Sequence, residues 1–405
     1  MAKYNYDKKA LKGLTPFPFL GEVKTRTQAI EAATDTLPTS IFNPNKIGRS
    51  LHPHIQFAKI AKVEDQPNAK AYTLIADKER GTEKLAYFRA GQYISVVVNI
   101  DKALVTKPYT LACNPKWALG EDSHYRIIVK KADNGYASTF IRENWKEGDS
   151  VVISGPLGNY YYQELRDAKK VIAASGGSGI TPFISMAYAV SEGLDDYELT
   201  ILMGDKKWDE IAFREELDDI AKKSGGKVKV IHVLSEEDKD GCEKGFITSD
   251  IIKKFAGKDD YSLFICGNKA FYKHMHGVVD ELGLPAKRAR FEVAGEYGDP
   301  SQNPDYHGDK NAEYKIIVHA RDKEYNITCK GDETLVHALQ SAGIGVTTDC
   351  RSGVCGWCHS RLICGNVFIP EDADGRREAD KKFGWIHPCV TYPMSDIEME
   401  VFPVV

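Results

Sequence analysis

Three cysteines lie close together near the C-terminal end of the chain, in the stretch DCRSGVCGWCHS at residues 349–360. Cys350, Cys355 and Cys358 have the spacing C-x4-C-x2-C, and Cys389 follows downstream in GWIHPCVTYP. This spacing is typical of a [2Fe-2S] site, in which a tight loop supplies three thiolates and a distant segment supplies the fourth. The four cysteines are therefore predicted to hold an iron-sulfur cluster.

A zinc site and a group of buried free thiols are the alternatives. Zinc sites usually combine two short Cys-x2-4-Cys pairs, or cysteines with histidines, whereas here a single x2 pair sits beside an x4 spacing. Gly353 and Gly356 allow the loop to turn tightly and leave backbone amides facing the sulfurs, which favours the cluster. Cys364 falls on a predicted strand that leaves the loop, and we expect it to be packed rather than ligating.

A second candidate site is the glycine-rich turn in VIAASGGSGITPFISMAYAV, residues 171–190. The backbone amides of such a turn, together with a helix N-terminus, can face a pyrophosphate. A glycine-rich turn alone is a weak signal. Here, however, the strands YELTILMG, KVKVIHVL and YSLFICG alternate with helical patterns, which predicts a doubly wound parallel sheet.

The upstream residues 55–155 are predicted to form short strands of a small antiparallel barrel. This region contains KPYT at 107–110, GYAS at 135–138 and, at its end, GPLGNYYY. An aromatic ring followed by a hydroxyl on one strand can cover a flat heterocycle and donate to its edge, and a Gly-x-x-Ser helix start can hold a phosphate. Taken singly, such residues are more often core tyrosines and ordinary helix caps.

The order of these motifs from about residue 55 to 295 resembles the ferredoxin-NADP reductase superfamily, with its R-x-Y-[ST], G-x-x-S, GGSGITP and Cys-Gly motifs. From about residue 313 onward the chain resembles a plant-type ferredoxin domain with a β-grasp fold. There the cysteines are flanked by two strands in AEYKIIVHARDKEYNITCKG, a helix in DETLVHALQSAGI and a strand in SDIEMEVF. Together the two parts look like the reductase component of an oxygenase system.

The resemblance implies a multidomain protein with a β-barrel flavin domain, an α/β nicotinamide domain and an α+β β-grasp [2Fe-2S] domain. The expected divisions are an N-terminal extension at 1–52, the FAD-binding barrel at 53–163, the NAD(P)-binding domain at 164–295, a linker at 296–312 and the ferredoxin domain at 313–405. The extension is expected to be a strap on the barrel, with a partner-docking arm as the alternative. The linker, rich in Gly, Pro, Asp and Asn, is expected to let the cluster reorient between the flavin and a partner.

The implied function is an NAD(P)H-dependent reductase that passes electrons from nicotinamide through a flavin to the cluster, and on to a redox protein such as an oxygenase. By the same resemblance Tyr109 lies along the isoalloxazine, Thr110 near flavin N5, Ser138 at the pyrophosphate and Cys266 near the reactive ring of the nicotinamide. Thr110 and Cys266 are the implied catalytic residues. The implied cofactor-binding residues are Lys107, Tyr109, Thr110, Gly135, Ala137, Ser138, Gly176, Gly177, Ser178, Gly179, Thr181, Pro182, Cys266 and Gly267.

The chain departs from the family pattern at two places. Lys107 stands where the family has arginine, so it can neutralise a phosphate without a two-pronged grip. The family's closing E-x-F appears as Glu292, Val293 and Ala294, so either the flavin face is open or Tyr297 covers it; we expect the open face. FAD is preferred to FMN because of the GPLGNYYY turn, and NADH is preferred to NADPH.

Composition limits the remaining classes. The net charge of −4 over 405 residues leaves no footprint for nucleic acid, and no apolar run reaches the roughly 20 residues of a membrane span. The N-terminus lacks a secretory signal, which predicts a cytoplasmic chain with reduced or metal-bound cysteines. Direct reduction of a small acceptor such as a quinone, and a non-catalytic redox-sensing module, are the alternative functions.

Overall fold

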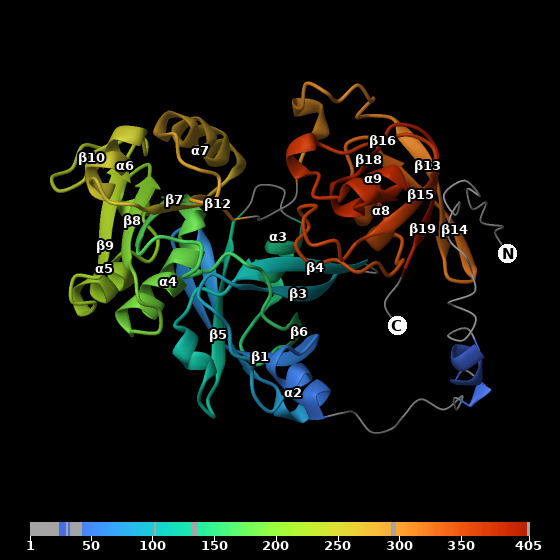
Figure 1. The fold of residues 1–405 in the computed structure, drawn as a ribbon, viewed down its shortest axis with the longest axis horizontal. Coiled ribbons are helices and arrows are strands. Elements are labelled where there is room, and N and C mark those ends of the chain that lie inside the picture. The colour runs from blue at the N-terminus through green and yellow to red at the C-terminus, as the bar shows by residue number, and fades with distance from the viewer. Residues whose placement is uncertain are drawn as a thin grey trace. The chain divides into compact units, whose positions relative to one another are not determined.

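The computed structural model describes residues 24–29, 31–32, 43–100, 103–131, 136–292 and 297–402. The chain divides into two compact units, Met1–Arg49 and Ser50–Val405. Helical residues at 24–29 and most of helix α2 (Asn43–Leu51) belong to the first unit, and all the sheets belong to the second (Figure 1). None of the described helices combines the length and the apolarity that crossing a membrane requires.

The first sheet is the predicted antiparallel barrel. Its strands, in the order β4-β3-β6-β1-β2-β5, are β1 (Ile55–Gln66), β2 (Ala69–Ala76), β3 (Tyr93–Ile100), β4 (Ala103–Thr110), β5 (His124–Lys130) and β6 (Ser150–Ser154). A bridge between Leu111 and Ile127 joins the two end strands and closes the barrel. Helix α3 (Tyr136–Asn144) buries Ala137 and Ile141 in the barrel core.

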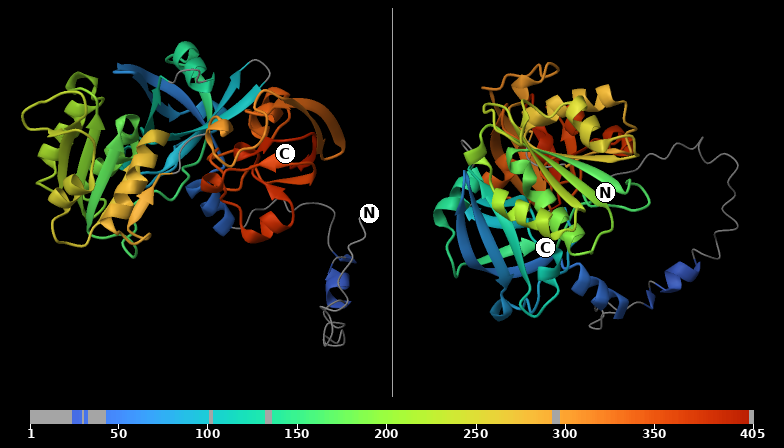
Figure 2. Two further views of the ribbon diagram at one scale, coloured as in Figure 1. Left: turned by 90° about the horizontal axis from the view of Figure 1, so that it is seen from above. Right: turned by 90° about the vertical axis from the view of Figure 1, so that its left-hand side faces the viewer.

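The second sheet is parallel throughout, as predicted, with the order β10-β9-β8-β7-β11-β12. Its strands are β7 (Lys170–Gly176), β8 (Glu198–Asp205), β9 (Val228–Leu234), β10 (Glu243–Lys244), β11 (Ser262–Cys266) and β12 (Ala289–Phe291). Helices α4 (Thr181–Ser191) and α5 (Arg214–Lys223) cover one face, and α6 (Ser249–Ala256) and α7 (Lys269–Leu282) cover the other (Figures 1 and 2). The strand order reverses beside β7, where sheets of this kind bind ligands at the carboxyl ends of their strands.

The C-terminal part forms a five-stranded mixed sheet in the order β14-β13-β19-β15-β17. Its elements are β13 (Glu313–Ala320), β14 (Lys323–Lys330), α8 (Leu335–Ser341), β15 (Ser360–Cys364), α9 (Glu378–Lys382), β17 (Trp385–Ile386) and β19 (Ile397–Val401), with a small second sheet of β16 (Val367–Phe368) and β18 (Tyr392–Pro393). Leu335 and Leu339 of α8 pack on Ile316, Val318 and Met399 of the sheet. This is the β-grasp layout that the sequence predicted.

The described part of the expected linker, residues 297–312, packs on the C-terminal sheets. Tyr306 is 9% exposed, its ring contacts Phe368 at 5.2 Å between centroids, and its hydroxyl donates to the Gly331 carbonyl at 3.0 Å. The Tyr392 hydroxyl donates to the Gly298 carbonyl at 2.6 Å. This segment is therefore anchored along the domain that follows it.

Candidate functional site

The buried carboxyl of Glu292 joins the barrel to the parallel sheet. Thr110 ends β4, Cys266 ends β11, and Glu292 directly follows β12. The Thr110 hydroxyl donates to Oε1 of Glu292 at 3.0 Å, and the Cys266 thiol donates to Oε2 at 2.7 Å. The two residues predicted to be catalytic are thus brought together by a third, Glu292, which the sequence analysis noted only as part of a motif.

This cluster of polar groups is almost closed to solvent. Glu292 is 6% exposed and Cys266 is 5% exposed. Burial raises the pKa of the Glu292 carboxyl, against hydrogen bonds from Cys266 and Thr110 that lower it. Burial, and then the charge of Glu292, raise the pKa of the Cys266 thiol, so this thiol stays protonated and donates. The Tyr272 hydroxyl fixes the segment by donating to the Glu292 carbonyl oxygen at 2.8 Å.

The glycine-rich turn packs directly on the end of β11. A Cβ atom on Gly179 would lie 1.9 Å from the Cys266 carbonyl oxygen, which no side chain tolerates. Cβ atoms on Gly176 and Gly267 would lie 2.6 Å and 2.4 Å from the ring of Phe271. Glycine is therefore required at these positions for β7, β11 and α7 to approach one another, beyond any role toward a ligand.

The turn opens onto a cavity of about 650 Å³ at the carboxyl edge of the parallel sheet. Its lining includes Gly176, Gly177 and Thr181 from the predicted site, where Thr181 begins α4 and Pro182 lies in its first turn. Asn68 and Lys130 of the barrel line the other side. A cavity of this size suits a small-molecule or cofactor ligand.

Asp205, at the end of β8, is a cavity residue that the sequence analysis did not select. Burial raises its pKa to about 7, with Lys130 opposing the shift and Glu210 adding to it. Among the residues that the structure describes, none donates a hydrogen bond to its Oδ2 atom. Asp205 thus lines the cavity with a half-buried carboxyl, although its Oδ2 atom is itself closed to solvent.

The predicted flavin residues lie on β4 and α3. Tyr109 packs against the barrel core, and its burial raises the pKa of its hydroxyl. Ala137 is 1% exposed, so only its backbone can face a ligand, while Ser138 is half-buried in the first turn of α3. Two sequence predictions, on Gly135 and Ala294, fall outside the described residues, and the side chain of Ser178 is likewise not described.

The four cysteines predicted as ligands lie in two pairs. The sulfurs of Cys358 and Cys389 are 3.3 Å apart, and the Cys355 amide donates to the Cys350 sulfur at 3.3 Å. A [2Fe-2S] cluster takes two thiolates on each iron, so two pairs fit it.

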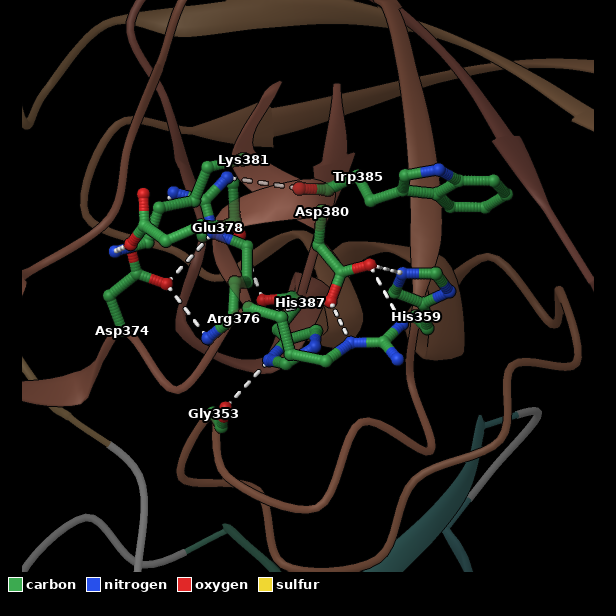
Figure 3. A network of polar contacts seen from close by, with 11 residues as sticks. Gly353, His359, Asp374, Arg376, Glu378, Asp380, Lys381, Trp385 and His387 are labelled. Atoms are coloured by element: carbon green, nitrogen blue, oxygen red, sulfur yellow. Dashed lines mark hydrogen bonds and ion pairs between the residues drawn. The ribbon is translucent and has the colours of Figure 1, made fainter. Parts of the chain in front are cut away.

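Polar contacts behind the cysteine loop connect it to the segment of the fourth cysteine (Figure 3). The buried His387 donates from Nδ1 to the Gly353 carbonyl at 2.6 Å. Arg376 donates to the Trp385 carbonyl at 2.9 Å, and the ring of His359 stacks on that of Trp385 at 4.2 Å between centroids. These contacts hold the two cysteine-bearing segments in a fixed relation.

Cys364 lies apart from these pairs on β15, as predicted, but it is exposed rather than packed. Its sulfur lies 3.7 Å from Oε2 of Glu398 on the neighbouring strand. The expectation of burial was wrong because Cys364 sits at the strand end, where a shift in the register between β15 and β19 turns it outward.

Three family models match successive parts of the chain. An oxidoreductase FAD-binding domain matches residues 67–162, an oxidoreductase NAD-binding domain matches 174–277, and a 2Fe-2S iron-sulfur cluster binding domain matches 318–394. The chain is a flavin reductase of the ferredoxin-NADP reductase superfamily with a C-terminal [2Fe-2S] ferredoxin domain. This reductase is an NAD(P)H-dependent oxidoreductase that uses FAD and a [2Fe-2S] cluster.

Curated relatives cover different parts of the reductase. The ferredoxin reductase component of 3-ketosteroid-9-alpha-monooxygenase from Rhodococcus rhodochrous is 28% identical over 344 residues, which are 83% of this chain and 93% of that protein. The flavohemoprotein of Bacillus subtilis (strain 168) is 32% identical over 242 residues, so the reductase spans only 58% of that relative. The solved structure of phthalate dioxygenase reductase is 24% identical, has a TM-score of 0.61, and covers 89% of this chain and 100% of its own, which shows a shared fold.

Proposed function

We propose that the reductase is the electron-donating component of an oxygenase system, which oxidises NADH and delivers single electrons to a partner redox protein. The observation that carries the proposal is the Thr110–Glu292–Cys266 contact, because it brings the flavin strand and the nicotinamide turn to one point. The match to a monooxygenase reductase component over nearly its whole length supports the partner class.

Each residue predicted to bind the flavin has its own role. Tyr109 would cover the flavin ring, Thr110 would hold its hydroxyl near the reacting atoms, and Lys107 and Ser138 would bind phosphate. When bound, the flavin accepts both electrons of a hydride and releases them singly, which a [2Fe-2S] cluster requires. Glu292 orients the Thr110 hydroxyl and the Cys266 thiol and keeps water out, since both of its oxygens accept hydrogen bonds from these groups.

Asp205 supports NADH over NADPH. It ends the second strand of the parallel sheet, where an acidic side chain accepts hydrogen bonds from the ribose hydroxyls of NADH and repels the extra phosphate of NADPH. The neighbouring Lys206 is already paired with Glu236 at 3.0 Å. Both residues line the cavity, so a carboxylate already balances the charge of Lys206 there.

The surface beside the cysteine loop supports a protein acceptor. Cys355 is the exposed member of the four cysteines, and it lies between Val354 and Trp357, which are 52% and 46% exposed. Large exposed apolar side chains, aromatic ones above all, are typical of protein contact surfaces. A partner that covers this patch would approach the cluster at its most accessible ligand.

Co-purification of the native partner from its source cells tests the proposal. We expect a captured protein that consumes oxygen at the expense of NADH only when the reductase is present. Trp357→Ala should weaken capture, whereas Phe383→Ala, which removes another exposed aromatic ring of the same domain, should not. Rapid reduction of a free quinone by the flavin alone, with no effect of Trp357→Ala on any protein acceptor, would support the small-acceptor function instead.

A further inference from the structure

The residue before Cys350 contacts the flavin barrel. The Ser95 hydroxyl of β3 donates to Oδ1 of Asp349, and the Tyr93 hydroxyl donates to Oδ2 at 3.4 Å. Ser95 is 3% exposed and Asp349 is 6% exposed, so this contact excludes water. A buried carboxylate needs such donors, because its charge is costly to bury without them.

The residue after Cys350 makes a second contact with the barrel. Arg351 is 1% exposed and has a φ of 54°, a left-handed conformation that is uncommon for a residue other than glycine. Its Nη1 donates to the Thr106 carbonyl of β4 at 3.2 Å and to Oε1 of Gln340 in α8 at 2.9 Å. The backbone around Cys350 is thus held in one conformation from both sides.

Both contacts end on the strands that carry the flavin motif. In the antiparallel register of β3 and β4, Tyr93 is opposite Thr110 and Ser95 is opposite Pro108. Thr106 directly precedes Lys107 on β4. The Cys350 side of the loop therefore faces the flavin strands, while Cys355 is exposed.

We propose that Asp349 and Arg351 are positioning residues that clamp the cluster loop onto β3 and β4, so that one docked arrangement of the ferredoxin domain serves both electron steps. Docked in this way, the loop would present the Cys350 side of the cluster to the flavin, which supplies single electrons when bound, and the exposed Cys355 side to the acceptor. No covalent bond forms or breaks at the clamp, and no proton is transferred there. The contacts of segment 297–312 lie within the C-terminal part, so the clamp rests on Asp349 and Arg351 alone, and it is an alternative to the expected reorienting cluster.

The proposal rests on the transfer of electrons from the flavin to the cluster, and it does not depend on the identity of the partner protein. Ser95→Ala is the deciding variant, because it removes one clamp hydroxyl from within the barrel and leaves the cysteine loop unchanged. Ser150→Ala is the matched control, since Ser150 also donates to an aspartate, Asp77, at 2.6 Å, but within the barrel. Asp349→Asn keeps an acceptor oxygen and removes the charge.

The measurement is anaerobic stopped-flow mixing of the holoenzyme with NADH, following flavin and cluster absorbance separately, with an EPR spectrum of the reduced cluster. In Ser95→Ala we expect unchanged flavin reduction, an unchanged EPR signal and cluster reduction slowed about tenfold, because a buried hydrogen bond to a charged group is lost from the docked state. Cluster reduction in Asp349→Asn should be slower than in the unmodified protein and faster than in Ser95→Ala. In Ser150→Ala it should proceed at the rate of the unmodified protein. Cluster reduction at the normal rate in Ser95→Ala, or an equal slowing in Ser150→Ala, would overturn the clamp.

Discussion

Replacing Asp205 with asparagine should shift the reductase from NADH toward NADPH. Asp205 lies at the end of β8 in the cavity beside the glycine-rich turn, and none of the described residues donates to its Oδ2 atom. Asparagine keeps the size and one acceptor oxygen but removes the charge. The variant therefore isolates the charge of this side chain from its shape.

The size of the effect follows from the hydrogen bonds involved. A hydrogen bond to a charged acceptor contributes about 1.5 to 3 kcal/mol and one between neutral groups about 0.5 to 1.5 kcal/mol, so the midpoints differ by about 1.3 kcal/mol, or nearly tenfold. We expect kcat/KM for NADH to fall about tenfold by this reasoning. For NADPH, kcat/KM should rise, because the carboxylate no longer repels the extra phosphate.

The dependence on pH gives the effect a second signature. Because burial raises the pKa of Asp205 to about 7, the carboxylate forms only near neutrality. In the unmodified protein, kcat/KM for NADH should rise through about pH 7, and in Asp205→Asn this rise should vanish. The folded protein also holds this proton more tightly than the unfolded chain, so stability without ligand should decline from about pH 4 to about pH 7, less so in the variant.

Steady-state kinetics with both nucleotides, and thermal unfolding at two pH values, measure these effects. Asp209→Asn is the control, because Asp209 is exposed in the short 3-10 helix Trp208–Glu210 and does not line the cavity. An unchanged ratio of NADH to NADPH efficiency in Asp205→Asn, with the pH profile preserved, would refute the role of this carboxylate.

Three further predictions concern the other cofactor sites. Cys389→Ser should abolish the cluster signal while NADH-driven reduction of an artificial two-electron acceptor survives, and loss of the cluster in Cys364→Ser instead would overturn the ligand assignment. Lys107→Arg should hold or tighten the flavin, whereas Lys107→Ala should weaken it by a charged contact of about 1.5 to 3 kcal/mol, as fluorescence titration of the flavin would show. Ala294→Phe should weaken nicotinamide binding in anaerobic titration by adding a ring over the flavin. Tyr297→Ala should change this binding little, because the Tyr297 hydroxyl already accepts a hydrogen bond from Asn303 at 2.8 Å. A large effect of Tyr297→Ala with none from Ala294→Phe would reject the open face.

Local patterns predicted the fold and much of the site. Strand and helix periodicity indicated the three large sheets, because each domain contains its own core. The cysteine spacing indicated the cluster, since three of the four predicted ligands come from one loop. The glycine turn also left a local signal, although the structure adds a reason for it: Gly179 must admit the Cys266 carbonyl oxygen at close range.

Contacts between distant segments left no such signal. Glu292 is 182 residues from Thr110, and Asp349 is 254 residues from Ser95, so no local pattern could pair them. Arg351 is an arginine inside a cysteine motif, where the sequence alone suggests a solvated charge, yet it is buried. Asp205 differs from the many acidic residues of the chain only through the cavity around it.

Anaerobic mixing of the holoenzyme with NADH tests the central account most directly. We predict that the flavin is reduced first and the cluster second, and that protein stripped of flavin shows no reduction of the cluster by NADH. Restoring FAD should restore both phases in the same order. Cluster reduction by NADH in the flavin-free protein, or a flavin that NADH does not reduce, would contradict the account.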